Sequence, residues 1–302
     1  SSSGSLASLH GPPSDRRSLV WVTRAGAVTP LPLAPGPYRN ARLSPDGSRV
    51  AVTVSNPDSD VWVFDAARGS QTRITADGRS LWPIWTDHGK GLVYSSTRGA
   101  PAALVAKSAN GTGEATVLID NRYINRGLDW SARGGLFYHR VEAPGADIWI
   151  RAPKSGDQLY VGGLGDQNEA RLSPNGSWVA VRSNETGASE VFVQPFPGNA
   201  NARKQVSVGG GLSPVWSHDG RELFFLRGNE AWAAAVPATG SSDFAEPRRL
   251  FTASFNVVEG LLDVAPDGRF LMVSTDRPGL VPTDFQLTLN IGDELRRRAA
   301  AP

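Results

Sequence analysis

The sequence has 302 residues, 40% hydrophobic and 20% charged, and its 31 Lys and Arg nearly balance its 29 Asp and Glu. This composition is ordinary for a globular chain, it excludes extended disorder, and its balanced charge gives no electrostatic basis for binding nucleic acid or an acidic membrane. Without a cysteine the chain has no thiol chemistry and no cysteine-ligated metal, and without an apolar run of about 20 residues it has no predicted membrane span.

The chain begins with a segment that we expect to be a disordered leader. Residues 1–17 are rich in Ser, Gly and Pro, a composition typical of mobile termini. A strand is predicted at residues 19–22 and another at residues 28–33, because both are short apolar runs. The only methionine is Met272, so we interpret the chain as an excised domain or a processed protein.

One four-residue turn then recurs six times. The copies begin at Ser44, Thr86, Ser131, Ser173, Ser217 and Ala265 and end on Gly47, Gly89, Gly134, Gly176, Gly220 and Gly268. Proline suits the second turn position, Asp or Asn the third, and glycine accepts the positive φ that follows. The glycines are 42, 45, 42, 44 and 48 residues apart, which is the period of a four-stranded propeller blade.

Apolar or aromatic runs of strand length flank each turn, and a third run follows in most copies. An acidic residue precedes the third run four times, at Asp60, Asp147, Glu190 and Glu230. Recurring acids resemble a metal pattern, but one acid per blade spreads them around the ring, where they cannot share an ion. We therefore predict that each accepts hydrogen bonds from a neighbouring loop.

The two ends of the chain are predicted to share the last blade. The N-terminal strands would follow two strands near residues 260–274, which closes the ring and leaves no exposed sheet edge. Residues 285–289 also read as a strand, which we expect to add to this blade, and a short helix is predicted from about residue 293 to 299. The fold class is therefore all-β: a six-bladed β-propeller of four-stranded antiparallel blades over residues 18–291, with a helix or tail over 292–302.

The repeat resembles the PD40, or WD40-like, motif of TolB-like propellers: a strand, Ser-Pro-Asp-Gly, a second strand, then an acid–apolar–Trp–apolar strand. The resemblance covers roughly residues 18–290. Within this family the chain is most similar to propeller domains of bacterial receptor-type serine/threonine kinases, at residues 36–40, 193–198 and 220–224. The resemblance implies an extracytoplasmic, periplasmic location and a sensor or protein-docking role, although the chain lacks the glycine-rich loop and His-Arg-Asp signature of a kinase.

Side-chain alternation predicts which residues face the central channel. The residue directly before each turn is apolar and should face the core between blades, so its predecessor should face the channel. The predecessors are Arg42, Ile84, Asp129, Arg171, Val215 and Asp263. Because Asp129 and Arg171 lie on adjacent blades, as do Arg42 and Asp263, we predict two cross-blade ion pairs. They either hold the ring closed or contribute to a polar ligand pocket.

Residues further up the same strands should crowd the channel mouth. The candidate ligand-binding residues are Tyr38, Arg39, Asn40, Arg42, Trp82, Asn125, Arg126, Asp129, Glu169, Arg171 and Asp263. A tryptophan beside charged groups suits a peptide or a small polar molecule. The alternative is a water-filled funnel without a ligand.

The leading functional hypothesis is a non-catalytic module that binds a protein, a peptide or a small polar ligand, without a cofactor or metal. One alternative is a lyase or hydrolase with its site in the channel. That site would have carboxylates but no histidine, and arginine neighbours are expected to lower the pKa of Asp129 and Asp263, which disfavours an acid role. A third hypothesis is an oligomerisation scaffold that uses the blade edges.

Overall fold

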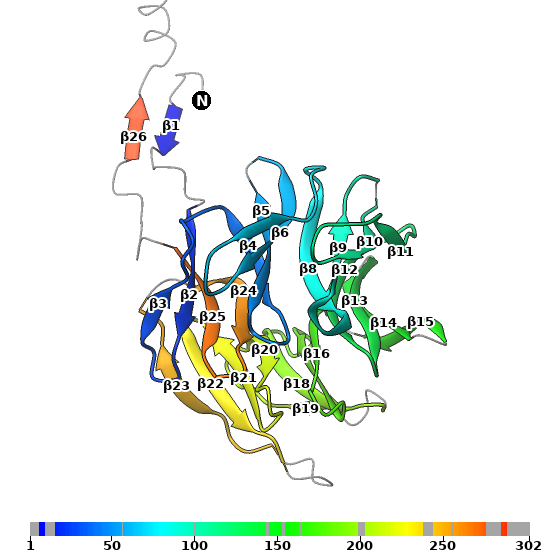
Figure 1. Cartoon of the computed structure of the whole chain (residues 1–302). Helices are drawn as coiled ribbons and strands as arrows, with labels where there is room; N and C mark the ends of the chain where they lie inside the picture. The colour runs from blue at the N-terminus through cyan, green and yellow to red at the C-terminus, as the bar shows by residue number, and fades with distance from the viewer. Residues whose placement is uncertain are drawn as a thin grey trace, which may run out of the picture.

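Six four-stranded antiparallel sheets are arranged around a ring in the computed structural model (Figure 1). The structure describes residues 6–9, 16–55, 57–99, 101–142, 145–152, 155–163, 165–198, 203–237, 244–254, 257–275 and 285–288. In the described part, the one short helix is a 3₁₀ turn at Asp87–Gly89. The predicted fold class is therefore confirmed, whereas the helix expected near residues 293–299 lies outside the described residues.

Each of the first five blades consists of four strands that follow one another in the sequence. Blade 1 is β4 (Tyr38–Leu43), β5 (Arg49–Ser55), β6 (Ser59–Asp65) and β7 (Gln71–Arg73). Blade 2 is β8 (Ser80–Thr86), β9 (Gly91–Ser96), β10 (Ala103–Ser108) and β11 (Thr116–Ile119). Blade 3 is β12 (Ile124–Ser131), β13 (Gly135–Glu142), β14 (Gly145–Ala152) and β15 (Gly156–Val161). Blade 4 is β16 (Gln167–Leu172), β17 (Trp178–Ser183), β18 (Glu190–Pro195) and β19 (Lys204–Gln205). Blade 5 is β20 (Leu212–Trp216), β21 (Glu222–Arg227), β22 (Glu230–Ala235) and β23 (Arg248–Thr252).

Blade 6 joins the two ends of the chain, as the sequence predicts. It consists of β24 (Val257–Val264), β25 (Phe270–Thr275), β2 (Arg17–Val22) and β3 (Val28–Pro30). The ring closes where β2 pairs antiparallel with β25, with Val20 opposite Met272. The inner strands β4, β8, β12, β16, β20 and β24 contact one another in turn around the axis.

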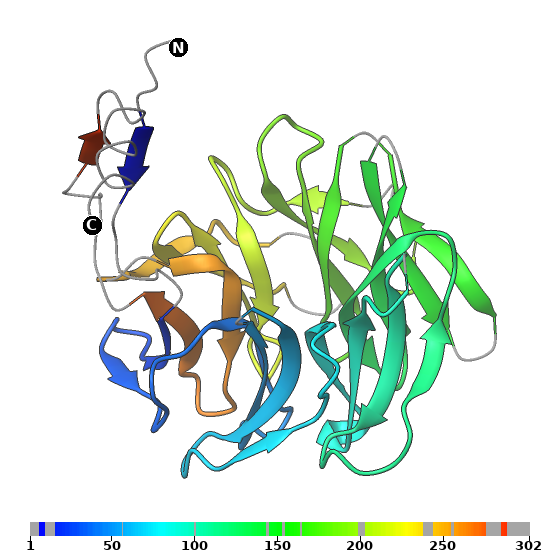
Figure 2. The same cartoon turned by 90° about the horizontal axis from the view of Figure 1, so that it is seen from above.

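The strand expected to extend blade 6 lies elsewhere. Strand β26 (Phe285–Thr288) pairs with β1 (Leu6–Leu9) in a separate two-stranded ribbon that stands apart from the ring in both views (Figures 1 and 2). The expected addition to blade 6 is wrong because β2 and β3 already fill its third and fourth places. Strand β1 also lies inside residues 1–17, where the sequence analysis expected no regular structure.

The core is divided among the six junctions between blades. Six clusters of buried apolar side chains each contain residues of two adjacent blades. For example, Phe224 of blade 5 packs edge-on against Phe270 of blade 6 with ring centres 5.0 Å apart. The residue before the turn takes part as predicted: Trp85 and Trp216 are buried. Each blade therefore depends on its neighbours for its apolar core.

The repeated turn also brings neighbouring blades together. In blade 1, the Ser44 hydroxyl accepts a hydrogen bond from the Arg49 N–H at 2.9 Å, and Gly47 has a φ of +72°. A Cβ on Gly47 would lie 2.6 Å from Pro266 in the turn of blade 6. Glycine is therefore required here both for its φ and for close contact across the ring closure.

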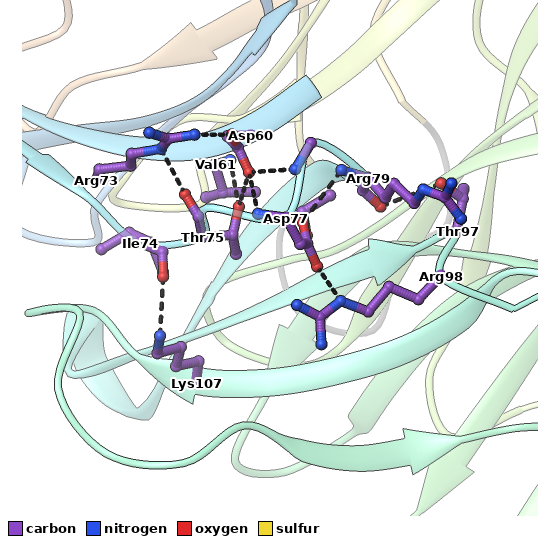
Figure 3. A network of polar contacts seen from close by, with 12 residues as sticks. Asp60, Val61, Arg73, Ile74, Thr75, Asp77, Arg79, Thr97, Arg98 and Lys107 are labelled. Atoms are coloured by element: carbon purple, nitrogen blue, oxygen red, sulfur yellow. Dashed lines mark hydrogen bonds and ion pairs between the residues drawn. The ribbon is translucent and has the colours of Figure 1, made fainter. Parts of the chain in front are cut away.

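The acid before the third strand joins one blade to the next. In blade 1, the buried Asp60 accepts hydrogen bonds from the Thr75 hydroxyl at 2.9 Å and from the backbone of Asp77 and Gly78 at 3.1 Å. These donors lie in the segment that leads into blade 2, and Asp77 also forms an ion pair with Arg98 of that blade (Figure 3). Asp60 thus connects the sheet of blade 1 to the segment that leads into blade 2.

The same role recurs in two further blades. Glu190 accepts hydrogen bonds from the Ser207 hydroxyl and the Gly210 N–H, and Asp147 accepts one from the backbone of Gly163. Glu230 differs, because its carboxylate forms an exposed ion pair with Arg249 of its own blade at 2.9 Å. The prediction of loop hydrogen bonds therefore holds for Asp60, Asp147 and Glu190 and is wrong for Glu230.

Candidate functional site

Every inner strand contains a bulge in the part that precedes the repeated turn. The strand pairing shifts by a bulge between Arg39 and Arg42, Leu81 and Ile84, Gly127 and Asp129, Gln167 and Glu169, Leu212 and Val215, and Val257 and Leu262. At three of these bulges a residue other than glycine has positive φ: Asn40 at +53°, Trp82 at +53° and Ser213 at +52°. Such backbone costs roughly 1–3 kcal/mol, and bulges commonly re-aim side chains at binding sites.

The bulges surround a hollow at the channel mouth, which we call the mouth hollow. It is lined by the inner strands of blades 1 to 5, through Asn40, Arg42, Trp82, Pro83, Ile84, Arg126, Gly127, Leu128, Glu169, Ala170, Arg171, Ser213 and Pro214. Its water-accessible volume is about 30 Å³, which holds only one or two waters. A ligand would therefore place a small group in the hollow and keep the rest of its bulk outside.

Charged side chains dominate the mouth hollow. Glu169 accepts a hydrogen bond from the Ser213 N–H at 2.8 Å and lies 3.8 Å from the Arg182 guanidinium. The Arg126 guanidinium stacks on the Trp82 ring, 5.2 Å from its centre. Arg171, in contrast, has no hydrogen-bond or ion-pair partner for its guanidinium in the described part of the chain. The Arg171 guanidinium therefore provides a positive charge in the hollow that could interact with a ligand.

Arg42, which also lines the mouth hollow, reaches across the channel. Its guanidinium donates a hydrogen bond to the Leu128 carbonyl at 2.8 Å, which connects blade 1 to blade 3. The two channel aspartates bind backbone instead: Asp129 accepts from the Leu172 N–H at 2.9 Å, and Asp263 accepts from the Leu43 N–H at 3.0 Å. Each aspartate thereby joins its own inner strand to that of the next blade.

The two predicted ion pairs are wrong. Among the described residues, neither Asp129 and Arg171 nor Arg42 and Asp263 come within the 4.0 Å of an ion pair. The adjacent blades were identified correctly, but each aspartate uses the N–H of the residue that follows the arginine. These backbone donors are fixed by the strand, whereas a long arginine side chain loses conformational entropy when it is held in place.

Burial sets the protonation of the channel aspartates. It raises the pKa of Asp129 to about 6, although the Leu172 N–H and the charge of Arg42 act in the opposite direction. Burial likewise raises the pKa of Asp263 against the charge of Arg42 and the Leu43 N–H. The expectation of lowered pKa values is therefore wrong, because loss of hydration outweighs the attraction of one arginine.

The sequence-predicted site residues fall into two groups. Asn40, Arg42, Trp82, Arg126, Glu169 and Arg171 line the mouth hollow. Tyr38 instead packs edge-on against Phe64 in the core and donates its hydroxyl to the Ala34 carbonyl. Asn125 is fully buried and donates to the Tyr123 carbonyl, and Arg39 is partly buried outside the lining. The bulge explains the difference, because one extra residue reverses the alternation beyond it.

Ser213 also lines the mouth hollow, although it was not among the candidate ligand-binding residues. Its hydroxyl is buried without a hydrogen-bond partner in the described part of the structure, and the residue is only 5% exposed. Its φ of +52° belongs to the bulge in β20, which no local sequence signal marks.

The other end of the channel has a different character. A cavity of about 400 Å³ opens there among the repeated turns, and its walls include Trp85, Trp130 and Leu172. Asp129 lies at this cavity, and the exposed His88 lies at its edge, where the turn of blade 2 is replaced by the 3₁₀ turn. This end is therefore mainly aromatic and apolar, whereas the mouth hollow is lined by guanidinium groups.

Within the described residues, no three His, Asp or Glu side chains gather in a way that would hold a metal ion. The same part of the chain contains no helix long and apolar enough to span a membrane.

Comparison with known proteins shows a shared fold. No family model matches the sequence, and no curated protein matches it. Among solved structures, a TolB-type protein of Agrobacterium tumefaciens superimposes with a TM-score of 0.70 at 17% identity, covering 87% of this chain and 99% of that one. TolB of Acinetobacter baumannii gives 0.60 at 14% identity, covering 80% of this chain and 68% of its own.

A propeller named for an enzyme is also similar. A protein of Bacteroides uniformis named as a 6-phosphogluconolactonase gives a TM-score of 0.52 at 13% identity, covering 91% of this chain and 95% of that one. At these identities the comparisons establish a TolB-like propeller fold, which hosts both binding proteins and enzymes.

Proposed function

We propose that the chain is a non-catalytic binding propeller that holds a polar group of a protein, peptide or small ligand in the mouth hollow. The observation that carries this proposal is the set of bulges in the inner strands, where Trp82 and Ser213 line the hollow with positive φ. Strain of this kind is usually retained at functional sites. It places an aromatic ring and several charged groups around one opening, which is a common arrangement for a binding site.

The same proposal extends to the setting of the domain. The resemblance of residues 36–40, 193–198 and 220–224 to propellers of bacterial receptor-type kinases supports a sensor or docking role within a larger extracytoplasmic protein. The TolB-like fold is consistent with this setting. The experiment is to express the domain with its neighbouring sequence and locate it by fractionation, with cytoplasmic recovery as the contrary result.

An enzyme is the second candidate, and one observation favours it. A carboxylic acid whose pKa is raised to about 6 lies at the cavity opposite the mouth hollow, which is a common property of catalytic acids. However, both oxygens of Asp129 accept hydrogen bonds, from the backbone N–H groups of Trp130 and Leu172. We therefore assign Asp129 to joining the blades.

A ligand screen tests the binding proposal. The purified domain is heated with peptides, sugars, nucleotides and divalent metals, and the same screen is run on Trp82→Gly, which fits the backbone at that position. A ligand that binds only the native state raises Tm with its concentration. We expect hits that stabilise the wild type and not the variant. Hits that stabilise both equally would place binding outside the mouth hollow and contradict the proposal.

A further inference from the structure

We propose that the group bound in the mouth hollow is an anion, a carboxylate or a phosphate, and that Arg171 is its principal contact. This inference rests on the proposed binding function and specifies the chemical class of its ligand. It follows from the partners of the guanidinium groups, the buried hydroxyl of Ser213 and the charge balance of the lining.

Arg171 and Arg42 occupy the same position of the repeat on opposite blades. Each directly precedes the leucine before a Ser-Pro turn. Arg42 uses its guanidinium to bond the Leu128 carbonyl across the channel. Arg171 lines the hollow and is only partly exposed, yet its guanidinium has no hydrogen-bond or ion-pair partner among the described residues. A partly desolvated charge without a partner is unfavourable for folding, so its presence suits a ligand of opposite charge.

Ser213 supplies a second unpaired donor in the same hollow. Its hydroxyl is buried and has no partner in the described part of the chain. Its backbone is held in place because its N–H donates to Glu169 at 2.8 Å. A buried hydroxyl without a partner is costly, and an anion would accept a hydrogen bond from it.

The charges of the lining favour an anion as well. Arg42, Arg126 and Arg171 line the hollow together with a single acid, Glu169. Glu169 already accepts a hydrogen bond from the Ser213 N–H, and it lies near Arg182, which is outside the lining. Stacking on Trp82 orients the guanidinium of Arg126 at the opening. Guanidinium groups bind carboxylates and phosphates through paired hydrogen bonds, and the narrow hollow admits one such group.

The experiment compares two variants that remove the same charge. Arg171→Gln removes the unpaired guanidinium, and Arg68→Gln removes an exposed arginine from the turn between β6 and β7. Binding of an oligoglutamate peptide, an oligoglutamine peptide of equal length and inorganic phosphate is measured by calorimetry, at low and at high salt. Tm of each variant is recorded without ligand.

We expect the wild type and Arg68→Gln to bind oligoglutamate or phosphate, more weakly at high salt, and to bind oligoglutamine much less. Arg171→Gln should weaken anion binding by roughly tenfold or more while its Tm does not fall. If only oligoglutamate binds in an Arg171-dependent way, the bound group is a carboxylate. If only phosphate does so, the bound group is a phosphate.

Two results would overturn the inference. One is equal anion binding by the wild type and Arg171→Gln. The other is tighter binding of oligoglutamine than of oligoglutamate, lost in Trp82→Gly and kept in Arg171→Gln. That result would support binding in the mouth hollow but would reject an anion as the bound group. If none of these probes binds, the inference of an anionic ligand is also overturned. The broader ligand screen described above tests the binding function separately.

Discussion

The blade 1 side and the blade 4 side of the channel start from the same repeat and end with different chemistry. Both contribute an arginine at the same repeat position, Arg42 and Arg171. On the blade 1 side the guanidinium donates to the Leu128 carbonyl of blade 3, near two buried aspartates. On the blade 4 side it has no such partner among the described residues. A repeat position therefore fixes where a side chain points, whereas the partners of the side chain decide whether it stabilises the fold or remains available for a ligand.

Removing each arginine in turn tests this difference most directly. Arg42→Gln should lower the free energy of unfolding by about 1–3 kcal/mol, because the Leu128 carbonyl loses its donor and the two buried aspartates lose a nearby positive charge. Arg171→Gln should change it by less than about 0.5 kcal/mol. Urea denaturation of both variants measures the difference. Equal losses would show that the two arginines share one structural role.

The acids before the third strands extend the comparison to another repeat position. Asp60→Ala should lower the free energy of unfolding by about 2–3 kcal/mol, because Thr75, Asp77 and Gly78 lose a buried acceptor. Glu230→Ala removes the equivalent acid in blade 5 and should have a much smaller effect, since its ion pair is exposed. Urea denaturation of the two variants checks this, and a larger loss for Glu230→Ala would reverse our assignment.

The pH dependence of stability tests the raised pKa values of the two channel aspartates, Asp129 and Asp263. Between the usual pKa of Asp129, 3.8, and its folded value of about 6, the folded chain holds a proton that the unfolded chain has released. The free energy of unfolding should therefore fall as pH rises from about 4 to 6, by about 2–3 kcal/mol from this group. Asp263, whose pKa is also raised, contributes with the same sign.

The comparison variant for this effect is Asp129→Asn. Carboxylates with lowered pKa, such as Asp60 and Glu222, act in the opposite sense, because their stabilisation is lost as pH falls. Subtracting the variant's pH profile from that of the wild type removes these contributions. A difference that does not vary with pH would mean that Asp129 is ionised normally.

The smallest expected effect concerns the strained backbone of the mouth hollow. Trp82→Gly should be more stable than Trp82→Ala by about 0.5–1 kcal/mol, because glycine accepts the φ of +53°. Ala170 lies in the same hollow without a positive φ, so Ala170→Gly should lose a similar amount. Thermal unfolding measures both, and the usual order of alanine above glycine at position 82 would contradict the strained conformation.

The sequence predicts the ring well because the repeat is local. The Ser-Pro-Asp-Gly turns, the apolar runs and the acids each carry their own chemistry, so blade number, strand order and ring closure follow from their spacing. The ribbon of β1 and β26 was missed, because its pairing joins Leu6–Leu9 to Phe285–Thr288 at opposite ends of the chain. No local pattern specifies a pairing over such a separation.

The site is less predictable because it depends on departures from the repeat. Strict alternation placed Tyr38 and Asn125 at the mouth, but the bulges turn them away, and only Asn40 is a residue type that favours positive φ. Neither Trp82 nor Ser213 signals this conformation. The partners of the channel aspartates were also hidden, since a backbone N–H is present at nearly every position and leaves no mark in the sequence.

Ring closure by β2 and β25 has a consequence for synthesis of the chain on the ribosome. Strands β2 and β3 emerge before the other strands of the ring, yet their partner, Phe270–Thr275, emerges only after five complete blades. Until then β2 has an unpaired edge, and the apolar side chains that later pack against blades 5 and 1 lack their partners. Chaperone capture or premature pairing of this nascent hairpin is therefore the main hazard of biogenesis for this architecture.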